Sequence, residues 1–304
     1  MSRAPSLTER QALLALLPEP WCDGDYQLSA LPSESNDNYL LSIQGKPSLV
    51  LRLAKADARS LGVNRSQEQM LYVWAAEKGL SPTLLWADRS KGIMLSEYFA
   101  DADHHTPVFI DSLAEQLARL HATPPDALPF EVNTRCILEH ISGYRKRLND
   151  TLRADCDLNP DMDVAFEVAE KRWLEMTEPS CLCHSDLHRD NILFHEGRVF
   201  FLDWEYTAYT PAILDIASLA QSYAWDAQQL QRFYSRYLRA QAIPEQDQQE
   251  HFQCLLNELP VARFLLALQS YYWSMLHYGT GKHSSQYHSA LMLEARNVSA
   301  RIDF

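Results

Sequence analysis

A short polar stretch in the second half of the chain has the residue types that phosphoryl transfer needs. His184, Asp186 and Asn191 form the pattern H-x-D-x-x-x-x-N, and Asp203 closes an apolar run shortly afterwards. A carboxylate can orient an attacking hydroxyl and accept its proton, and oxygen ligands suit Mg²⁺. The spacing therefore predicts Asp186 as the catalytic base, with Asn191 and Asp203 as ligands of a Mg²⁺ ion that bridges the phosphates of a nucleotide.

The composition is that of an ordinary globular protein. The chain has 304 residues, 46% of them hydrophobic and 22% charged, which is enough for two lobes. Its net charge of -13 argues against nucleic acid or an anionic membrane as the main partner and is compatible with a cationic ligand. No apolar run approaches the roughly 20 residues of a membrane helix, and no signal peptide is expected. We therefore expect a cytoplasmic protein whose six cysteines are reduced thiols.

Strand patterns dominate the first third of the chain. Runs rich in β-formers flank a turn at Gly45, which predicts an antiparallel hairpin over residues 38–53. Two more strands are expected within residues 83–98, separated by a polar turn. These elements predict a mostly antiparallel sheet.

Helical patterns account for most of the rest. A short helix with Thr8 as its cap precedes the strands, and a helix capped by Asn64 is expected to end at Gly79. Apolar residues recur at helical spacing in the later segments 108–121, 135–152, 162–176 and much of 213–300. The polar connection from Ala100 to Thr106 is the expected boundary. We therefore predict an α/β fold of the α+β kind, with lobes over residues 1–100 and 101–304.

Two motifs resemble a known superfamily of enzymes. H-S-D-L-H-R-D-N-I-L-F over residues 184–194 and L-D-W-E-Y over residues 202–206 are similar to the catalytic region of the aminoglycoside phosphotransferase superfamily, above all to its choline, ethanolamine and thiamine kinases. The resemblance implies a protein-kinase-like fold, with ATP and Mg²⁺ as cofactors. Protein kinases carry D-F-G and a long activation segment, whereas here Trp204 and Glu205 follow the aspartate and only a short interval precedes the next helix. A protein substrate is therefore not expected.

The resemblance also assigns roles in the nucleotide-binding lobe. It places Arg52 against the α- and β-phosphates, Glu68 as the ion-pair partner of Arg52, and residues Glu97 to Phe99 at the hinge that receives the adenine edge. The family usually has a glycine in its phosphate loop, but residues 31–40 contain none. The backbone amides that would hold the phosphates are therefore not predicted.

Further roles follow for the catalytic and substrate lobe. By resemblance Asp215 braces the catalytic loop, although a carboxylate at the start of a helix is the simpler alternative. His184 is expected to be a buried residue that ties the loop. Glu205 and Tyr206 follow the metal carboxylate and are expected to line the acceptor site. Trp273 belongs to an aromatic helix similar to the one that cages quaternary ammonium in choline kinases.

The sequence thus predicts an ATP- and Mg²⁺-dependent kinase for a small cationic alcohol such as choline, ethanolamine or thiamine. Two alternatives stay open. One is an aminoglycoside, amino-alcohol or sugar acceptor, and the other is an inactive kinase-like protein that only binds a nucleotide.

A zinc site at Cys181 and Cys183 is not expected. No second pair of ligands lies nearby in the sequence, and we expect the two side chains to point to opposite faces of their strand.

Overall fold

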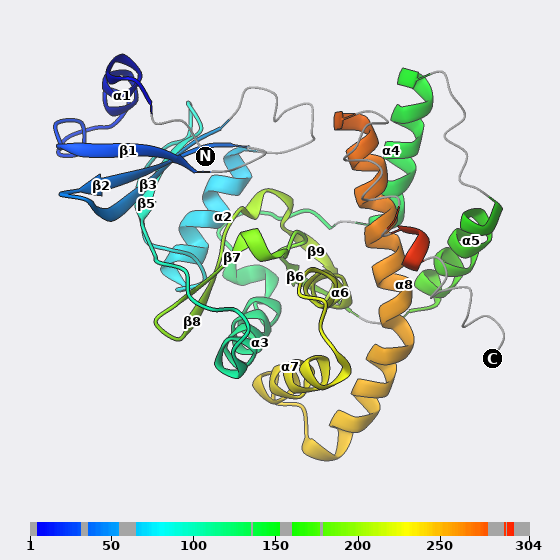
Figure 1. Cartoon of the computed structure of the whole chain (residues 1–304). Coiled ribbons are helices and arrows are strands. Elements are labelled where there is room, and N and C mark those ends of the chain that lie inside the picture. Colours follow the sequence, from blue (N-terminus) through cyan, green and yellow to red (C-terminus); the bar gives the residue numbers. More distant parts are fainter. Residues whose placement is uncertain are drawn as a thin grey trace. The chain divides into compact units, whose positions relative to one another are not determined.

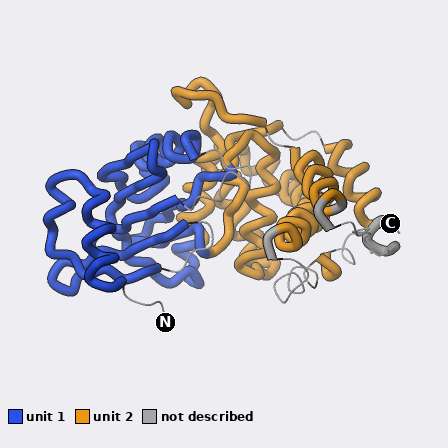
Figure 2. The backbone as a smooth tube through the Cα atoms, turned by 90° about the horizontal axis from the view of Figure 1, so that it is seen from above, with its two compact units in different colours: residues 1–109, 190–206 blue, residues 110–189, 207–304 orange. Residues whose placement is uncertain are grey.

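The structure of the chain is a computed structural model that describes residues 5–31, 36–54, 65–134, 136–152, 160–176, 179–278, 289 and 291–294. The chain forms two compact units (Figure 2). Unit 1 contains residues 1–109 and 190–206, and unit 2 contains residues 110–189 and 207–304. The segment 190–206 therefore packs with the N-terminal unit, although it follows the polar connection at which the sequence analysis divides the chain.

Unit 1 is built on a five-stranded antiparallel sheet (Figure 1). The strand order is β1-β2-β3-β5-β4, with bounds β1 Tyr26–Leu31, β2 Asn36–Ile43, β3 Lys46–Ala54, β4 Leu84–Asp88 and β5 Ile93–Glu97. Gln44 and Gly45 join β2 to β3 with positive φ angles of 49° and 76°, as a tight hairpin turn requires. The predicted hairpin is confirmed.

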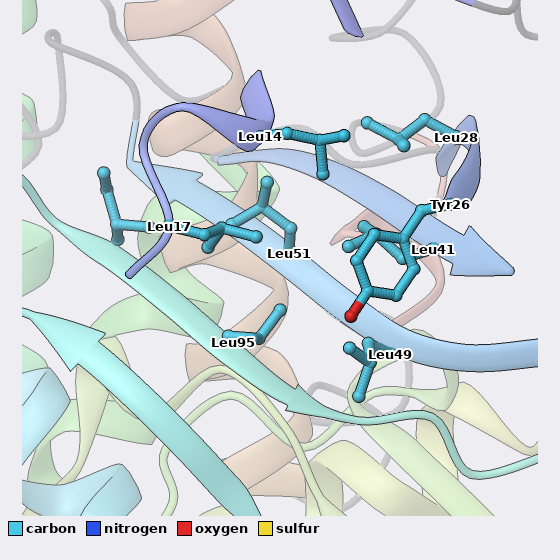
Figure 3. Packing of buried hydrophobic residues seen from close by; sticks show 9 residues of the cluster. Leu14, Leu17, Tyr26, Leu28, Leu41, Leu49, Leu51 and Leu95 are labelled. Carbon is cyan, nitrogen blue, oxygen red and sulfur yellow. The ribbon is translucent and has the colours of Figure 1, made fainter. Parts of the chain in front are cut away.

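A leucine-rich core covers one face of this sheet. Helix α1 (Leu7–Leu14) and the residues after it pack their side chains onto the strands. Figure 3 shows the cluster, whose labelled members are Leu14, Leu17, Tyr26, Leu28, Leu41, Leu49, Leu51 and Leu95. The cap of α1 is Ser6, which forms a capping box with Glu9, so the prediction of Thr8 was wrong by two residues.

Helix α2 (Arg65–Glu77) is the internal helix of unit 1. It buries Leu71, Trp74 and Ala75, and it is followed by Gly79, whose φ of 66° suits the end of a helix. The predicted cap Asn64 lies outside the described residues, as do residues 32–35 of the glycine-free segment.

The segment 190–206 adds a second hairpin to unit 1. Strands β7 (Ile192–His195) and β8 (Arg198–Phe201) pair antiparallel, with the 3-10 turns η3 (Arg189–Asn191) before them and η4 (Trp204–Tyr206) after them. The amide of Phe201 donates to the Leu80 carbonyl oxygen at 2.7 Å, just beyond α2. This bond fixes the end of β8, from which Asp203 follows.

Unit 2 is mainly helical. Its helices are α3 (Pro107–His121, beginning in unit 1), α4 (Ile137–Leu152), α5 (Pro160–Glu175), α6 (Ile213–Ser222), α7 (Ala227–Ala240) and α8 (Glu245–Tyr278), with the 3-10 turn η2 (Pro125–Ala127). Helix α8 packs against α4 and α6 (Figure 1). A two-stranded antiparallel sheet pairs β6 (Ser180–Cys183), which leads into the loop beginning at His184, with β9 (Ala208–Pro211). Among the described helices, none is long and apolar enough to cross a bilayer.

Candidate active site

Three charged residues from distant parts of the sequence meet in unit 1. Arg52 lies on β3, Glu68 on α2, and Asp203 follows β8. The Arg52 guanidinium forms an ion pair with Glu68, and its Nη2 lies 3.1 Å from the Oδ1 atom of Asp203. The side chain of Glu68 is only 2% exposed, so the carboxylate that holds Arg52 is shielded from water. The structure therefore brings together the phosphate-binding, ion-pairing and metal-binding candidates of this unit.

Arg65 joins this group although the sequence analysis missed it. Its Nη1 atom lies 2.8 Å from Glu68 Oε2 and 2.9 Å from Glu205 Oε2. We call Arg52, Arg65, Glu68, Asp203 and Glu205 the charge cluster. Arg65 precedes Glu68 by one helical turn, and this spacing is the signal that could have identified it.

The charge cluster has more acids than bases and suits a further cation. Burial alone would lower the pKa of Arg52, but Asp203, Glu68 and Glu205 raise it overall, so the guanidinium stays charged. Burial, with Asp203 and Glu68 nearby, raises the pKa of Glu205 to about 8 against the opposite effect of the two arginines. Carboxylate oxygens of Glu68, Asp203 and Glu205 lie within 4.8 Å of one another. Hard oxygen donors suit a divalent ion such as Mg²⁺, and Asp203 is the member of this set that the sequence predicts as a ligand.

Hydrogen bonds between uncharged groups fix the backbone beside Asp203. The φ angle of Asp203 is 63°, which is uncommon for a residue other than glycine and needs support from its surroundings. The fully buried Trp204 donates from Nε1 to Ser81 Oγ at 2.7 Å, and Ser81 donates to the Phe201 carbonyl oxygen at 2.8 Å. The Leu202 amide donates to the backbone oxygen of Asn191 at 2.9 Å, which ties the buried second metal candidate to the same loop.

The hinge candidates lie at the end of β5. The Glu97 amide donates to the Thr83 carbonyl oxygen at 3.0 Å, which secures the strand end. The Phe99 ring stacks on His195, with ring centroids 4.9 Å apart, and meets Phe200 edge-on at 4.8 Å. The hinge candidate Phe99 thus packs against two aromatic rings of unit 1.

The loop 184–189 of unit 2, which carries the predicted catalytic base, is held by Asp215. This carboxylate is fully buried on α6 and accepts two backbone hydrogen bonds of 2.8 Å, from the amides of His184 and Ser185. Asp186 comes next, with a side chain that is 36% exposed and an Oδ2 atom 3.6 Å from His188 Nε2. The carboxylate of Asp186 is therefore accessible, while the backbone before it is fixed.

Helix α6 also contacts the loop through its hydroxyls. Ser218 donates from Oγ to the Leu187 carbonyl oxygen at 2.8 Å, and the Arg189 amide donates to Ser222 Oγ at 2.9 Å. One helix thus binds the loop at four positions. The remaining acceptor candidates, Tyr206 in η4 of unit 1 and Trp273 in α8 of unit 2, are both half-buried.

A second group that the sequence analysis missed supports Asp215. His121, the last residue of α3, places Nε2 3.2 Å from Asp215 Oδ2 and Nδ1 2.8 Å from the Tyr237 hydroxyl. Nothing local in the sequence marks His121, because its partners lie 94 and 116 residues away.

The cysteines of β6 lie beside His121. The Sγ atoms of Cys181 and Cys183 are 3.5 Å apart, so the prediction that they point to opposite faces was wrong. Residues two apart on a strand share a face. The hydrogen bond to Cys183 is the main reason that the pKa of Cys181 falls to about 6.

A family model and a curated relative identify what the chain is similar to. The family model described as the phosphotransferase enzyme family matches residues 27–252. Protein LicA of Haemophilus influenzae is 25% identical over 199 residues, which make up 64% of this chain. The match spans 57% of that relative's own length.

Solved structures share the fold over nearly the whole chain. A choline/ethanolamine kinase family protein from Mesorhizobium loti has a TM-score of 0.72 at 18% identity, covering 98% of this chain and 95% of that one. A macrolide 2'-phosphotransferase type I has a TM-score of 0.65 at 16% identity, covering 95% and 98%. The predicted fold class and the predicted superfamily are confirmed.

Proposed function

The chain belongs to the phosphotransferase enzyme family, and we propose that it transfers the γ-phosphoryl group of ATP to the hydroxyl of a small cationic alcohol in a Mg²⁺-dependent reaction. The observation that carries the proposal is the position of Arg52 between Glu68 and Asp203. A buried acid that holds a cation next to a metal-binding acid is an arrangement that phosphoryl transfer uses.

The groups of unit 1 bind the nucleotide in this proposal. Arg52 exchanges its contact with Asp203 for the phosphates, while Glu68 keeps the guanidinium in place. Asn191 and Asp203 would hold Mg²⁺, which neutralises charge on the phosphates when bound. The backbone of Glu97 and Phe99 would receive the adenine edge.

Asp186 acts on the acceptor. Its carboxylate orients the acceptor hydroxyl and takes up the proton as the hydroxyl oxygen bonds to the γ-phosphorus and the bond to the bridging oxygen of ADP breaks. Asp215 and His184 position the loop, so that Asp186 meets the hydroxyl without a prior rearrangement of the backbone.

The proposal also names the class of acceptor, a small cationic alcohol. A choline/ethanolamine kinase family protein is among the structural neighbours, and the chain carries an excess of acidic groups. Glu205, Tyr206 and Trp273 are the residues proposed to line the acceptor site, where an aromatic face contributes roughly 0.5–2 kcal/mol to a cation. The macrolide phosphotransferase neighbour keeps a larger acceptor, such as a macrolide or an aminoglycoside, as the second candidate.

The test is ADP release with a panel of acceptors at saturating ATP and Mg²⁺. The panel contains choline, ethanolamine, thiamine, an aminoglycoside, a macrolide and the neutral choline isostere 3,3-dimethylbutan-1-ol. Asp186→Asn serves as the control for ADP release that does not depend on the catalytic loop. We expect a cationic alcohol to give the highest kcat/KM and to exceed the neutral isostere.

Two results would change the assignment. Equal rates with choline and its neutral isostere, together with inert thiamine and ethanolamine, would move the larger acceptors ahead. Failure of every acceptor, with ATP binding intact, would favour the inactive nucleotide-binding alternative.

A further inference from the structure

Two thiols and an imidazole meet inside unit 2, beside the buried carboxylate of Asp215 but without a part in the proposed proton or phosphoryl transfer. Cys181 and Cys183 come from β6, and His121 ends α3. The Sγ atoms are 3.5 Å apart, and Cys183 Sγ lies 3.6 Å from His121 Nε2. All three donor atoms lie within 4.8 Å of one another.

These distances are those of ligands that share one metal ion. Tetrahedral zinc has Zn–S bonds of about 2.3 Å and Zn–N bonds of about 2.0–2.1 Å, so its ligand atoms lie about 3.5–3.8 Å apart. We propose that Cys181, Cys183 and His121 form a binding site for a thiophilic divalent cation, of which Zn²⁺ is the expected example. Three protein ligands with one further position is a coordination pattern that zinc accepts.

The surroundings suit such a site. The Cys183 side chain is fully buried and the His121 side chain is 1% exposed, while Cys181 is only partly buried and offers a route for the ion. His121 Nδ1 lies 2.8 Å from the Tyr237 hydroxyl, and Nε2 lies 3.2 Å from Asp215 Oδ2, a contact that an ion bound to Nε2 would replace. A hydrogen bond at the second ring nitrogen is the usual way in which proteins orient a metal-binding histidine.

The position of the site gives it a consequence for the fold. An ion held there links the end of α3 to β6, and β6 leads directly into His184 and the catalytic loop. The proposal is independent of the acceptor and of the Mg²⁺ ligands, because it uses soft donors in unit 2, whereas the charge cluster offers hard oxygen donors in unit 1.

The same geometry is also compatible with two neutral thiols and no metal ion. The Sγ atoms of Cys181 and Cys183 lie 3.8 and 3.4 Å from the Thr210 carbonyl oxygen, to which a thiol can donate. The two arrangements are distinguishable because only a thiolate-bound metal produces a thiolate-to-metal charge-transfer band.

The test uses the full chain without a polyhistidine tag, reduced and freed of metal by a chelator. Co²⁺ is titrated under anaerobic conditions, with circular dichroism as the check that each variant is folded. We expect a thiolate-to-cobalt band in the near ultraviolet and visible bands of tetrahedral cobalt. Both should saturate at one Co²⁺ per chain and disappear on addition of Zn²⁺.

Matched serine variants separate this site from adventitious binding. Cys181→Ser changes a partly exposed ligand and is expected to weaken Co²⁺ binding at least about tenfold and to reduce the charge-transfer band. Cys254→Ser makes the same change at an exposed cysteine and is expected to behave as the unmodified chain. Zn²⁺ should raise the melting temperature of the unmodified chain and of Cys254→Ser, but not of Cys181→Ser.

A folded, reduced chain that shows no charge-transfer band with Co²⁺ overturns the proposal. Equal Co²⁺ affinity in Cys181→Ser and the unmodified chain overturns it as well. Asp203→Ala, which alters the proposed Mg²⁺ site, should keep the cobalt spectrum, so failure of one proposal can be told from failure of the other.

Discussion

The charge cluster of unit 1 and the loop anchor of unit 2 hold acidic side chains in opposite ways. In unit 1, Asp203 and Glu68 are paired with the side chain of Arg52. In unit 2, Asp215 is bonded to the backbone amides of His184 and Ser185. A side-chain ion pair can exchange partners by rotation about side-chain bonds, whereas a backbone amide moves only when the chain moves.

This difference matches the two tasks of a phosphotransferase. In the proposed mechanism Asp203 gives up a partner when a nucleotide and its metal ion bind, and Arg52 compensates the charge of Asp203 until then. The proposed role of Asp186 requires a fixed position, and the backbone before it is bonded to the buried Asp215 on α6. The following predictions test whether the acids of unit 1 exchange partners and whether Asp215 fixes the backbone of the loop in unit 2.

The largest effect is expected from Asp186→Asn. The amide cannot accept the proton of the acceptor hydroxyl, so turnover should fall by ~10² or more, while ATP binding stays close to normal. Steady-state ADP release and equilibrium ATP binding measure the two quantities. Glu196→Gln, at a side chain that is 84% exposed in the β7–β8 turn, is the control and should not change either one. Near-normal turnover in Asp186→Asn would remove Asp186 from the mechanism.

A smaller effect is expected from Asp215→Asn, on stability. The two carboxylate oxygens of Asp215 each accept a backbone amide, whereas asparagine has a single side-chain oxygen. One buried amide therefore loses its acceptor, which costs about 1–3 kcal/mol. Urea unfolding should show a loss of that size. Asp226→Asn is the control, since asparagine serves equally well at the N-cap of α7. If both variants unfold at the same urea concentration as the unmodified chain, Asp215 does not fix the loop.

Asp203→Ala is expected to raise the Mg²⁺ concentration that the reaction requires. Loss of one oxygen ligand should raise the Mg²⁺ concentration for half-maximal activity at least about tenfold, with a smaller shift for Asn191→Ala. Binding of ATP in the absence of Mg²⁺ should not weaken in Asp203→Ala, because Arg52 keeps Glu68 and is free of its second carboxylate. An unchanged Mg²⁺ requirement in both variants would mean that other residues hold the ion.

Much of the fold follows from local sequence patterns. The hairpin about Gly45 and the end of α2 before Gly79 could be predicted because turn and helix-end residues act on their own neighbourhood. The cap of α1 was misplaced by two residues since Ser6 and Thr8 are both good caps, and only the reciprocal bonds between Ser6 and Glu9 select the first. Residues 190–206 pack with unit 1 through contacts between segments far apart in the sequence, which no local pattern predicts.

The candidate site divides in the same way. Asp186, Asn191 and Asp203 lie close in sequence and form a recognisable motif, so their types and spacing could be interpreted directly. Arg65 is marked only by its helical spacing from Glu68, and His121 has no local signal at all. Their partners Glu205 and Asp215 lie 140 and 94 residues away, and nothing in the chemistry of an isolated arginine or histidine indicates such a partner.

The smallest expected effect concerns the fixed part of unit 1. Ser81→Ala removes the hydroxyl that accepts from Trp204 Nε1 and donates to the Phe201 carbonyl oxygen, and the free energy of unfolding should fall by about 1–2 kcal/mol. Ser90→Ala, whose hydroxyl bonds Asp88 in an exposed turn, should change it by less than about 0.5 kcal/mol. Since Trp204 anchors the loop that carries Asp203, the Mg²⁺ requirement should rise in Ser81→Ala as well. A stability loss with no change in the Mg²⁺ requirement would show that Asp203 is positioned by its ion pair with Arg52 alone. The hydrogen bonds of Ser81 would then not play the part in unit 1 that the Asp215 bonds play in unit 2.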